Sequence, residues 1–305
     1  MQGLAKSTKP IQIYVIAPNE KSLIVAKNRF KEVSKPTNSK ISYLQNIRGI
    51  PKNIDLAIIA TTANVRREVI ESLLDKCSMK YLILEKVVFQ KSVDFKPIQN
   101  LLFEKNVKTW VNCTRRSFLF YKKLKKELGT DKLSIKVEGN NWGLASNSIH
   151  MIDLLAFLSE KNNFIFDTDG LENILISSKR NGFSELKGTL KIQTSRGDTL
   201  ELKEKGKYDK HTKISISNDK MHFNIYETQN RVVKYILDKE AYADHIRIPF
   251  QSELTGSAID QILDTGESDL TSYDECMKYH LPMLDALNTH ISKVTGQTVT
   301  ICPIT

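Results

Sequence analysis

Short apolar segments alternate with amphipathic segments along the first third of the chain. Residues 11–16 and 54–60 are apolar and rich in β-branched side chains, which is typical of strands covered on both faces. After the first of them, Leu23, Ala26 and Phe30 recur at helical spacing. The expected strands are residues 11–16, 41–44, 54–60 and 81–84. This repeated strand–helix pattern predicts a doubly wound parallel sheet in an α/β fold.

The hydrophobic pattern changes twice in the rest of the chain. Between about residues 174 and 225, apolar and polar residues alternate, which predicts a mostly antiparallel sheet with one face in water. The expected strands of this sheet are residues 189–194, 199–202, 213–217 and 221–226. From Tyr273 to Ile291, apolar residues follow at spacings of three and four, which predicts a long helix that Pro282 should kink. Because 305 residues exceed one average core, we expect an α/β domain at 1–115 and an α+β domain with an open sheet at 116–305.

Charge and composition exclude several classes of partner. The chain has 45 Lys and Arg against 35 Asp and Glu, a net charge of +10, but the basic residues are spread out and aromatic residues are not interleaved with them. A solvated surface is therefore favoured over a nucleic-acid groove. No apolar run reaches the roughly 18–20 residues that span a membrane, and residues 1–10 contain no apolar core of a secretory signal. The four cysteines form no CxxC pair and no metal-ligand spacing with histidine, so we expect a reducing cytoplasm and no metal.

Ligands of doubly wound sheets bind outside the carboxyl ends of the strands. Residues 17–19, 61–64 and 85–86 follow three of the expected strands, and 61–64 is rich in small hydrogen-bonding side chains. The position predicts a ligand site there. Polar loops at these ends without a ligand remain the alternative.

The residues at these ends resemble those of a known family. Thr61-Thr62-Ala63-Asn64 after one buried strand, Glu85-Lys86 after the next, and His150-x-x-Asp153 further on are similar to motifs of the glucose–fructose oxidoreductase and inositol dehydrogenase (Gfo/Idh/MocA) family. Gln251–Thr255 and the terminal helix with His280 and Pro282 extend the resemblance over nearly the whole chain. Residues 141–150 resemble the branch found in bacterial surface-polysaccharide and nucleotide-sugar pathways.

The resemblance implies an NAD(P)-dependent oxidoreductase that acts on a hydroxyl or carbonyl of a sugar or nucleotide sugar. It implies a Rossmann-like domain for NAD or NADP, and a C-terminal domain whose open sheet makes a homo-oligomer. The cofactor-binding residues that follow from it are Asn19, Thr61, Thr62, Asn64, Glu85 and Lys86.

Lys86 and His150 are the candidate catalytic residues. Lys86 matches the lysine of the family's Glu-Lys-Pro motif, and an ammonium there suits the proton movement that accompanies hydride transfer. Its alternative is a surface lysine paired with Glu85. Asp153 lies about one helical turn after His150 and could orient the ring, whereas a core histidine is the alternative. For His280, which lies in an apolar stripe, the structural interpretation is favoured.

Substrate contacts are expected near the junction of the two domains. The candidates are Arg115, Arg116, Asn140, Trp142 and Asp153. Ordinary loop and packing roles are the alternative for these residues.

Three departures from the family pattern bear on the chemistry. Ser146 stands where the family has a catalytic aspartate, so Lys86 and His150 would share the proton work, and Val87 replaces the motif's proline. No glycine lies between Gly3 and Gly49, so no glycine-rich phosphate loop is present. We therefore expect that the first strand and its loop are lacking. A degenerate, non-catalytic protein that binds a sugar or a partner is the alternative function.

Overall fold

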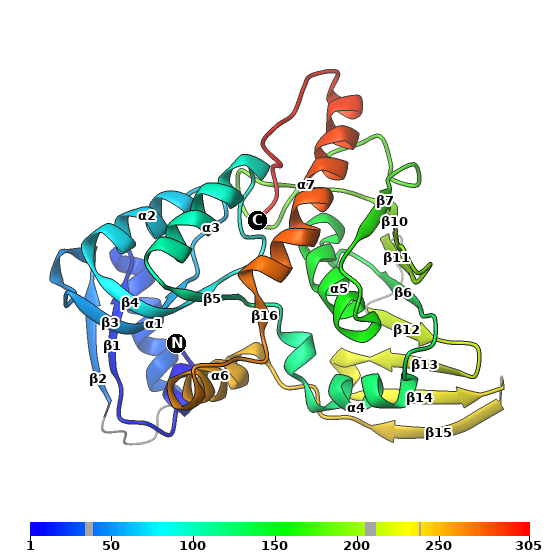
Figure 1. The fold of residues 1–305 in the computed structure, drawn as a ribbon, viewed down its shortest axis with the longest axis horizontal. Helices are drawn as coiled ribbons and strands as arrows, with labels where there is room; N and C mark the ends of the chain where they lie inside the picture. The colour runs from blue at the N-terminus through cyan, green and yellow to red at the C-terminus, as the bar shows by residue number, and fades with distance from the viewer. Residues whose placement is uncertain (34–38, 205–211, 238) are drawn as a thin grey trace.

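A computed structural model describes residues 1–33, 39–204, 212–237 and 239–305. It consists of a parallel α/β unit beside a large mixed sheet, with helices α5 (Leu144–Ser159) and α7 (Tyr273–Thr295) between the sheet and the first unit (Figure 1). No helix in these parts of the chain is long and apolar enough to cross a membrane.

The first unit contains the strands that the apolar pattern predicts. Its elements are β1 (Gln12–Ile16), α1 (Glu20–Lys31), β2 (Lys40–Leu44), β3 (Asn53–Ile59), α2 (Arg66–Lys76), β4 (Ser78–Leu84), α3 (Phe95–Glu104) and β5 (Lys108–Val111). Neighbouring strands run parallel, as predicted. Asn19 begins α1, because its side-chain oxygen accepts a hydrogen bond from the Lys21 N–H at 2.9 Å.

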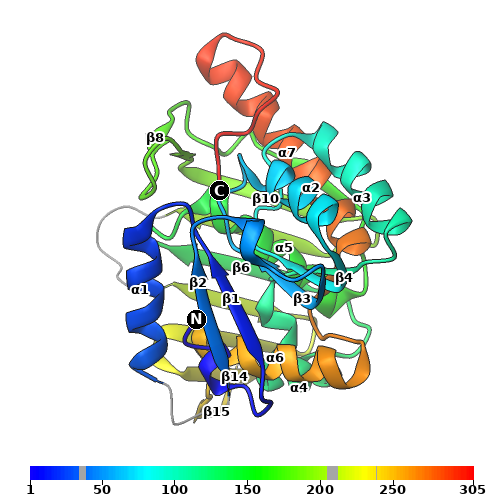
Figure 2. The same cartoon turned by 90° about the vertical axis from the view of Figure 1, so that its left-hand side faces the viewer.

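The parallel strands form two separate groups. Within the described residues, β1 pairs only with β2, and β3 pairs only with β4, so β1–β2 and β3–β4–β5 are distinct sheets (Figure 2). The classic doubly wound order places one further strand between these two halves, and the turn after that strand holds the pyrophosphate of a dinucleotide. No described strand occupies that place.

The second unit is built on an eight-stranded sheet. Its strands are β6 (Ser134–Gly139), β7 (Phe164–Asp167), β10 (Gly188–Thr194), β11 (Thr199–Glu204), β12 (Lys213–Ser217), β13 (Met221–Tyr226), β14 (Arg231–Ile236) and β15 (Lys239–His245), in the order β15-β14-β13-β12-β6-β11-β10-β7. Most pairs are antiparallel, as predicted, but β11 and β12 are not neighbours. β6 lies between them, parallel to β11, because its fully buried Ile135 and Val137 match apolar positions on both sides.

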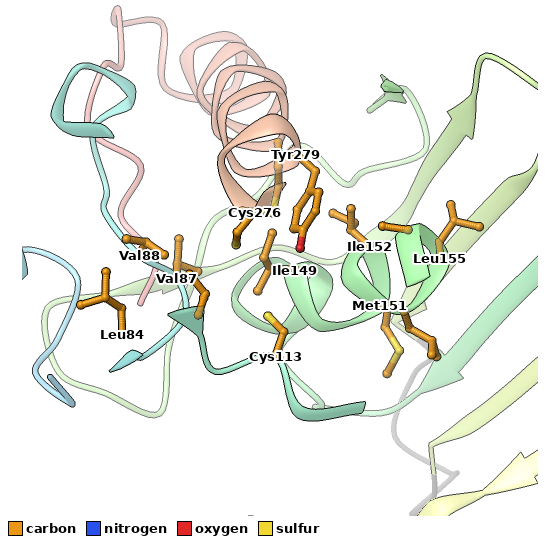
Figure 3. Close-up of a cluster of buried hydrophobic side chains, with 14 of the residues drawn as sticks. Leu84, Val87, Val88, Cys113, Ile149, Met151, Ile152, Leu155, Cys276 and Tyr279 are labelled. Carbon is orange, nitrogen blue, oxygen red and sulfur yellow. The ribbon is translucent and has the colours of Figure 1, made fainter. Parts of the chain in front are cut away.

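One hydrophobic core joins the two units. Figure 3 shows residues after β4, such as Val87 and Val88, near Ile149 of α5 and Cys276 of α7. α4 (Leu119–Leu128) lies at the junction, and α7 runs as one helix through Pro282. This core fixes the loop after β4 against the first turns of α5.

The chain returns to the first unit near its end. β16 (Thr271–Ser272) pairs antiparallel with β5, and Asp260 of α6 (Gln251–Thr265) accepts hydrogen bonds from Ser7 and Thr8. Residues 251–272 therefore pack against the α/β unit, although they belong to the sequence range predicted for the second domain. The division at residue 115 stays a prediction.

Candidate active site

Lys86 lies two residues past the end of β4 and reaches the first turn of α5. Its Nζ donates to the carbonyl of Ser146 and to Oδ1 of Asn147, both at 3.0 Å. The helix begins at Gly143, which has a positive φ of 77°, and a Cβ there would lie 2.9 Å from the Ser146 hydroxyl. The glycine thus allows the tight turn that presents these two acceptors to Lys86.

The surroundings of Lys86 ease the loss of its proton. Burial is the largest influence and lowers the pKa of the amine below its usual value. Cys113, Glu85 and Glu185 act in the opposite direction, and Arg180 lowers the pKa further. An amine with a lowered pKa can exchange a proton more readily near neutral pH.

His150 lies one turn after Ser146 on α5. Burial, followed by the charges of Lys86 and Arg115, holds its pKa well below the usual value, so the ring is neutral at neutral pH. Its Nδ1 is buried and has no hydrogen-bond partner in the part of the chain that the structure describes. A neutral imidazole with a free ring nitrogen can accept a proton or a hydrogen bond from a ligand.

Asp153 does not orient His150, contrary to the prediction from their spacing. Its fully buried carboxylate accepts hydrogen bonds from Arg116 at 2.8 and 3.0 Å and from the Tyr279 hydroxyl at 2.5 Å. A spacing of three residues turns the two side chains about 60° apart on the helix. Asp153 therefore faces Tyr279 of α7 and Arg116 of the short 3-10 turn that precedes α4, not the imidazole.

The predicted substrate contacts Arg115, Arg116 and Asp153 are held in buried ion pairs. Arg116 bridges Asp153 and Glu275, and Arg115 binds Glu227 at 2.7 and 2.9 Å. Asp153 has no exposed surface, and Arg116 is only 8% exposed. The structure gives Arg116 and Asp153 a packing role in place of the predicted contact with substrate.

Arg66, which the sequence did not single out, connects the loops after β3 and β4. Its guanidinium is buried and donates to the carbonyls of Thr61, Val87 and Val88. Burial lowers its pKa to about 10. An arginine in the first turn of a helix is typical of a solvated position, so the sequence did not indicate that Arg66 would be buried and would bond to both loops.

Four buried polar atoms lack a partner in the described residues. They are Thr61 Oγ1, Arg66 Nε, His150 Nδ1 and Asn288 Oδ1. The first three belong to the loop after β3, to the arginine that braces it, and to the helix that holds Lys86. Each unpaired buried polar group costs about 1–3 kcal/mol, so a ligand that supplies partners would bind favourably here.

Comparisons with known proteins identify the fold of the chain. No protein-family model matches the chain, and no curated protein matches it. Among solved structures, a Gfo/Idh/MocA family oxidoreductase from Vibrio cholerae superposes with a TM-score of 0.68 over 96% of this chain and 94% of that one, at 15% identity. This chain has the Gfo/Idh/MocA fold.

Two further structures with the Gfo/Idh/MocA fold have named activities. UDP-N-acetylglucosamine 3-dehydrogenase GnnA from Acidithiobacillus ferrooxidans has a TM-score of 0.69 and 10% identity, over 94% of this chain and 99% of that one. KijD10, a 3-ketoreductase from Actinomadura kijaniata crystallised with NADP, has a TM-score of 0.66 and 12% identity, over 92% and 98%. At these identities the likeness establishes the fold.

The predicted cofactor residues occupy the strand ends of this Gfo/Idh/MocA fold. Thr61, Thr62 and Asn64 follow β3, and Glu85 accepts a hydrogen bond from Asn112 at 2.6 Å. Asn19 is exposed and its side chain caps α1. The Thr61 hydroxyl is buried and has no partner among the described residues, and β1 is followed by Pro18 and Asn19. Contact of these residues with a nicotinamide cofactor stays a prediction.

The remaining predicted residues lie around the start of α5. Asn140 is half-buried just after β6, and the Trp142 indole donates to the Lys203 carbonyl at 3.3 Å. Their contact with a substrate stays a prediction.

His280 is fully buried, its Nε2 accepts from the Val88 N–H at 3.4 Å, and burial lowers its pKa to about 3, in keeping with a structural histidine. In the described parts of the chain, no cluster of three His, Cys, Asp or Glu residues could hold a metal ion.

Proposed function

We propose that this protein is an NAD(P)-dependent oxidoreductase that acts on a hydroxyl or carbonyl carbon of a sugar or nucleotide sugar. The observation that carries the proposal is that Lys86, just after β4, bonds to the first turn of α5, and that one turn further along α5 the neutral imidazole of His150 has an unpaired Nδ1 among the described residues. The named activities of GnnA and KijD10 support the substrate class and the cofactor. A role in surface-polysaccharide synthesis, within a reducing cytoplasm, extends the same proposal.

The two candidate catalytic residues suit complementary tasks. A bound NAD or NADP would accept or supply the hydride. His150, which is neutral, accepts the proton that leaves the substrate hydroxyl, and Lys86 donates a hydrogen bond to the same oxygen as negative charge develops. In reduction the ammonium of Lys86 gives a proton to the substrate oxygen and is left as the neutral amine. Thr61, Thr62, Asn64 and Glu85 would hold the cofactor.

A cofactor titration tests this proposal directly. NADH and NADPH are titrated against the 305-residue chain while nicotinamide fluorescence is followed. We expect micromolar binding of at least one of them, and weaker binding by the Thr61→Val variant, which removes the unpaired hydroxyl. Ser72→Ala, an exposed hydroxyl on α2, is the matched control. No binding at millimolar cofactor would contradict the proposal.

We also propose a homo-oligomer formed through the eight-stranded sheet. In β6 and β12, buried apolar residues alternate with polar residues that stay partly exposed, so one sheet face is left without a core of its own. Light scattering of the full chain is expected to give a dimer or a larger species. A monomer at all concentrations would rule this assembly out.

A second candidate function is a non-catalytic protein that binds a sugar or a partner. The observation that favours it is the place between β1 and β3, where the pyrophosphate-binding strand of a doubly wound sheet belongs and where no described strand lies. Calorimetry with UDP-N-acetylglucosamine separates the two functions. Binding of the nucleotide sugar without binding of NADH or NADPH would support the non-catalytic candidate.

A further inference from the structure

Glu185 is a buried carboxylate beside the candidate active site that the proposed mechanism does not use. It ends β9 (Ser184–Glu185), which forms a small hairpin with β8 (Ile176–Ser177). The side chain is only 7% exposed. Its carboxylate accepts hydrogen bonds from the Ala145 N–H at 2.9 Å and from the Ser146 N–H at 3.3 Å. A negative charge at the N-terminus of α5 is stabilised by these free N–H groups and by the helix dipole.

The same turn of α5 receives Lys86. The N–H of Ser146 donates to Glu185, while the carbonyl of Ser146 accepts from Lys86 at 3.0 Å. Asn147, the next residue, supplies the second acceptor for Lys86. Glu185 and Lys86 therefore both bind the first turn of α5, the carboxylate through its N–H groups and the ammonium through its oxygens. Hydrogen bonds linked in this way polarise one another.

Several charged groups face Lys86 from the elements packed around it. Glu85 precedes it in the same loop, and Cys113 follows β5. Arg180 and Glu185 come from the β8–β9 hairpin and carry opposite charges. Burial and Arg180 lower the pKa of Lys86, and the charge of Glu185 raises it. Glu185 thus favours the ammonium form.

We propose that Glu185 is a positioning residue for Lys86: it fixes the first turn of α5 where Ser146 and Asn147 receive the amine, and its charge opposes the loss of the proton that a substrate can take from this amine. The hairpin thereby supplies a carboxylate to a site in which position 146 is a serine. The role in the reaction rests on the proposed function. The effect on Lys86 does not, because it exists in the protein without cofactor or substrate.

Acylation of Lys86 as a function of pH tests the proposal. The free protein is treated with a small amount of acetic anhydride between pH 6 and 10, and mass spectrometry compares Lys86 with the exposed Lys80 as an internal reference. Only the neutral amine reacts. Glu185→Gln keeps an oxygen that accepts the helix N–H bonds but removes the charge, so we expect Lys86 to be acylated faster at neutral pH, by about threefold or more.

Three variants separate charge from structure. Glu185→Asp keeps the charge and is expected to react more slowly than Glu185→Gln. Glu185→Ala also frees the turn, so Lys86 should react fastest in that variant. Glu253→Gln, which changes a glutamate at the start of α6, is the matched control and should leave the Lys86 profile unchanged. Near-ultraviolet circular dichroism checks that each variant is folded.

The outcomes are distinct. A merely structural cap predicts equal Lys86 profiles for the wild type and Glu185→Gln, and equal profiles, including no reaction in either protein, overturn the proposal. If the profiles differ but neither NADH nor NADPH binds, Glu185 controls Lys86 while the oxidoreductase function fails. If cofactor binds and turnover is found, Glu185→Gln should lower kcat more than it raises KM and shift the pH profile of kcat.

Discussion

Asp153 and His150 lie within one turn of each other on α5, and each belongs to a group of buried polar side chains. The two groups differ in how many of their polar atoms have hydrogen-bond partners. Around Asp153, every polar atom has a partner: Arg116 binds it with two nitrogens, and Tyr279 donates to it. Among the described residues, the Nδ1 of His150 has no partner, and neither has the Thr61 hydroxyl in the loop after β3. In the described residues, folding gives every polar atom of the first group a hydrogen-bond partner. The second group keeps polar atoms for which these residues supply no partner.

This difference distinguishes buried polar groups with a structural role from those that could bind a ligand, and it does not depend on the types of residue involved. Both groups contain a cation, an acid or a histidine, and both are shielded from water. A satisfied buried network specifies how elements pack, in this case the 3-10 turn before α4 against α5 and α7. Unpaired buried atoms instead carry a cost of about 1–3 kcal/mol each, which a bound ligand relieves. The candidate active site is therefore the side of α5 that faces Lys86.

The largest effect is expected from breaking the satisfied group. Asp153→Ala leaves the Arg116 guanidinium buried with only Glu275 as an acidic partner, so we expect the free energy of unfolding to fall by about 3–5 kcal/mol in urea titrations. The exposed Asp75→Ala should change it little. The double variant Arg116→Met with Asp153→Leu should recover much of the loss, because it removes both charges. A small effect of Asp153→Ala would mean that this group is not the packing network described.

The unsatisfied group is expected to respond in the opposite way. Lys86→Met removes a partly buried ammonium, so the free energy of unfolding should be unchanged or higher, while turnover with a nucleotide sugar falls at least about 100-fold. Lys91→Met, five residues along the same segment, is the control for loss of a positive charge. Turnover within a few-fold of the wild type would remove Lys86 from the mechanism.

The sequence predicted the parts of the fold that depend on local pattern. The strands β1 to β4 and their parallel direction follow from apolar runs separated by helical segments. The position of β6 between β11 and β12 did not follow, because pairing between distant strands leaves no periodic signal in either strand. For the same reason, the return of β16 to β5 could not be predicted.

The site shows the same limit. Lys86 could be identified because the end of a buried parallel strand is a defined place in such a fold. The spacing of His150 and Asp153 was compatible with a hydrogen bond, but spacing cannot tell that Arg116, 37 residues away in sequence, takes the carboxylate. Glu185 lies 39 residues from the N–H it accepts from, and nothing near it in the sequence marks it. Contacts made by folding decided these roles.

The smallest expected effect concerns His280, which lies between the two groups and bonds to the backbone of the loop after β4. Burial lowers its pKa in the folded protein to about 3, whereas an unfolded chain has a value near 6.5. Between these values the unfolded state binds the proton and the folded state does not. The contribution of His280 to stability is therefore full above about pH 6.5 and is lost as pH falls toward about 3.

The pH dependence of the free energy of unfolding tests the role of His280 by itself. We expect His280→Gln to reduce the loss of unfolding free energy between pH 6 and pH 5 by about 1 kcal/mol, because one proton accounts for about 1.4 kcal/mol per pH unit. Urea titrations at the two pH values measure the slope, and the exposed His245→Gln is the control. An unchanged slope in His280→Gln would mean that this ring can take up a proton in the folded state. His280 would then not be the structural histidine that its burial and its bond to the Val88 N–H indicate.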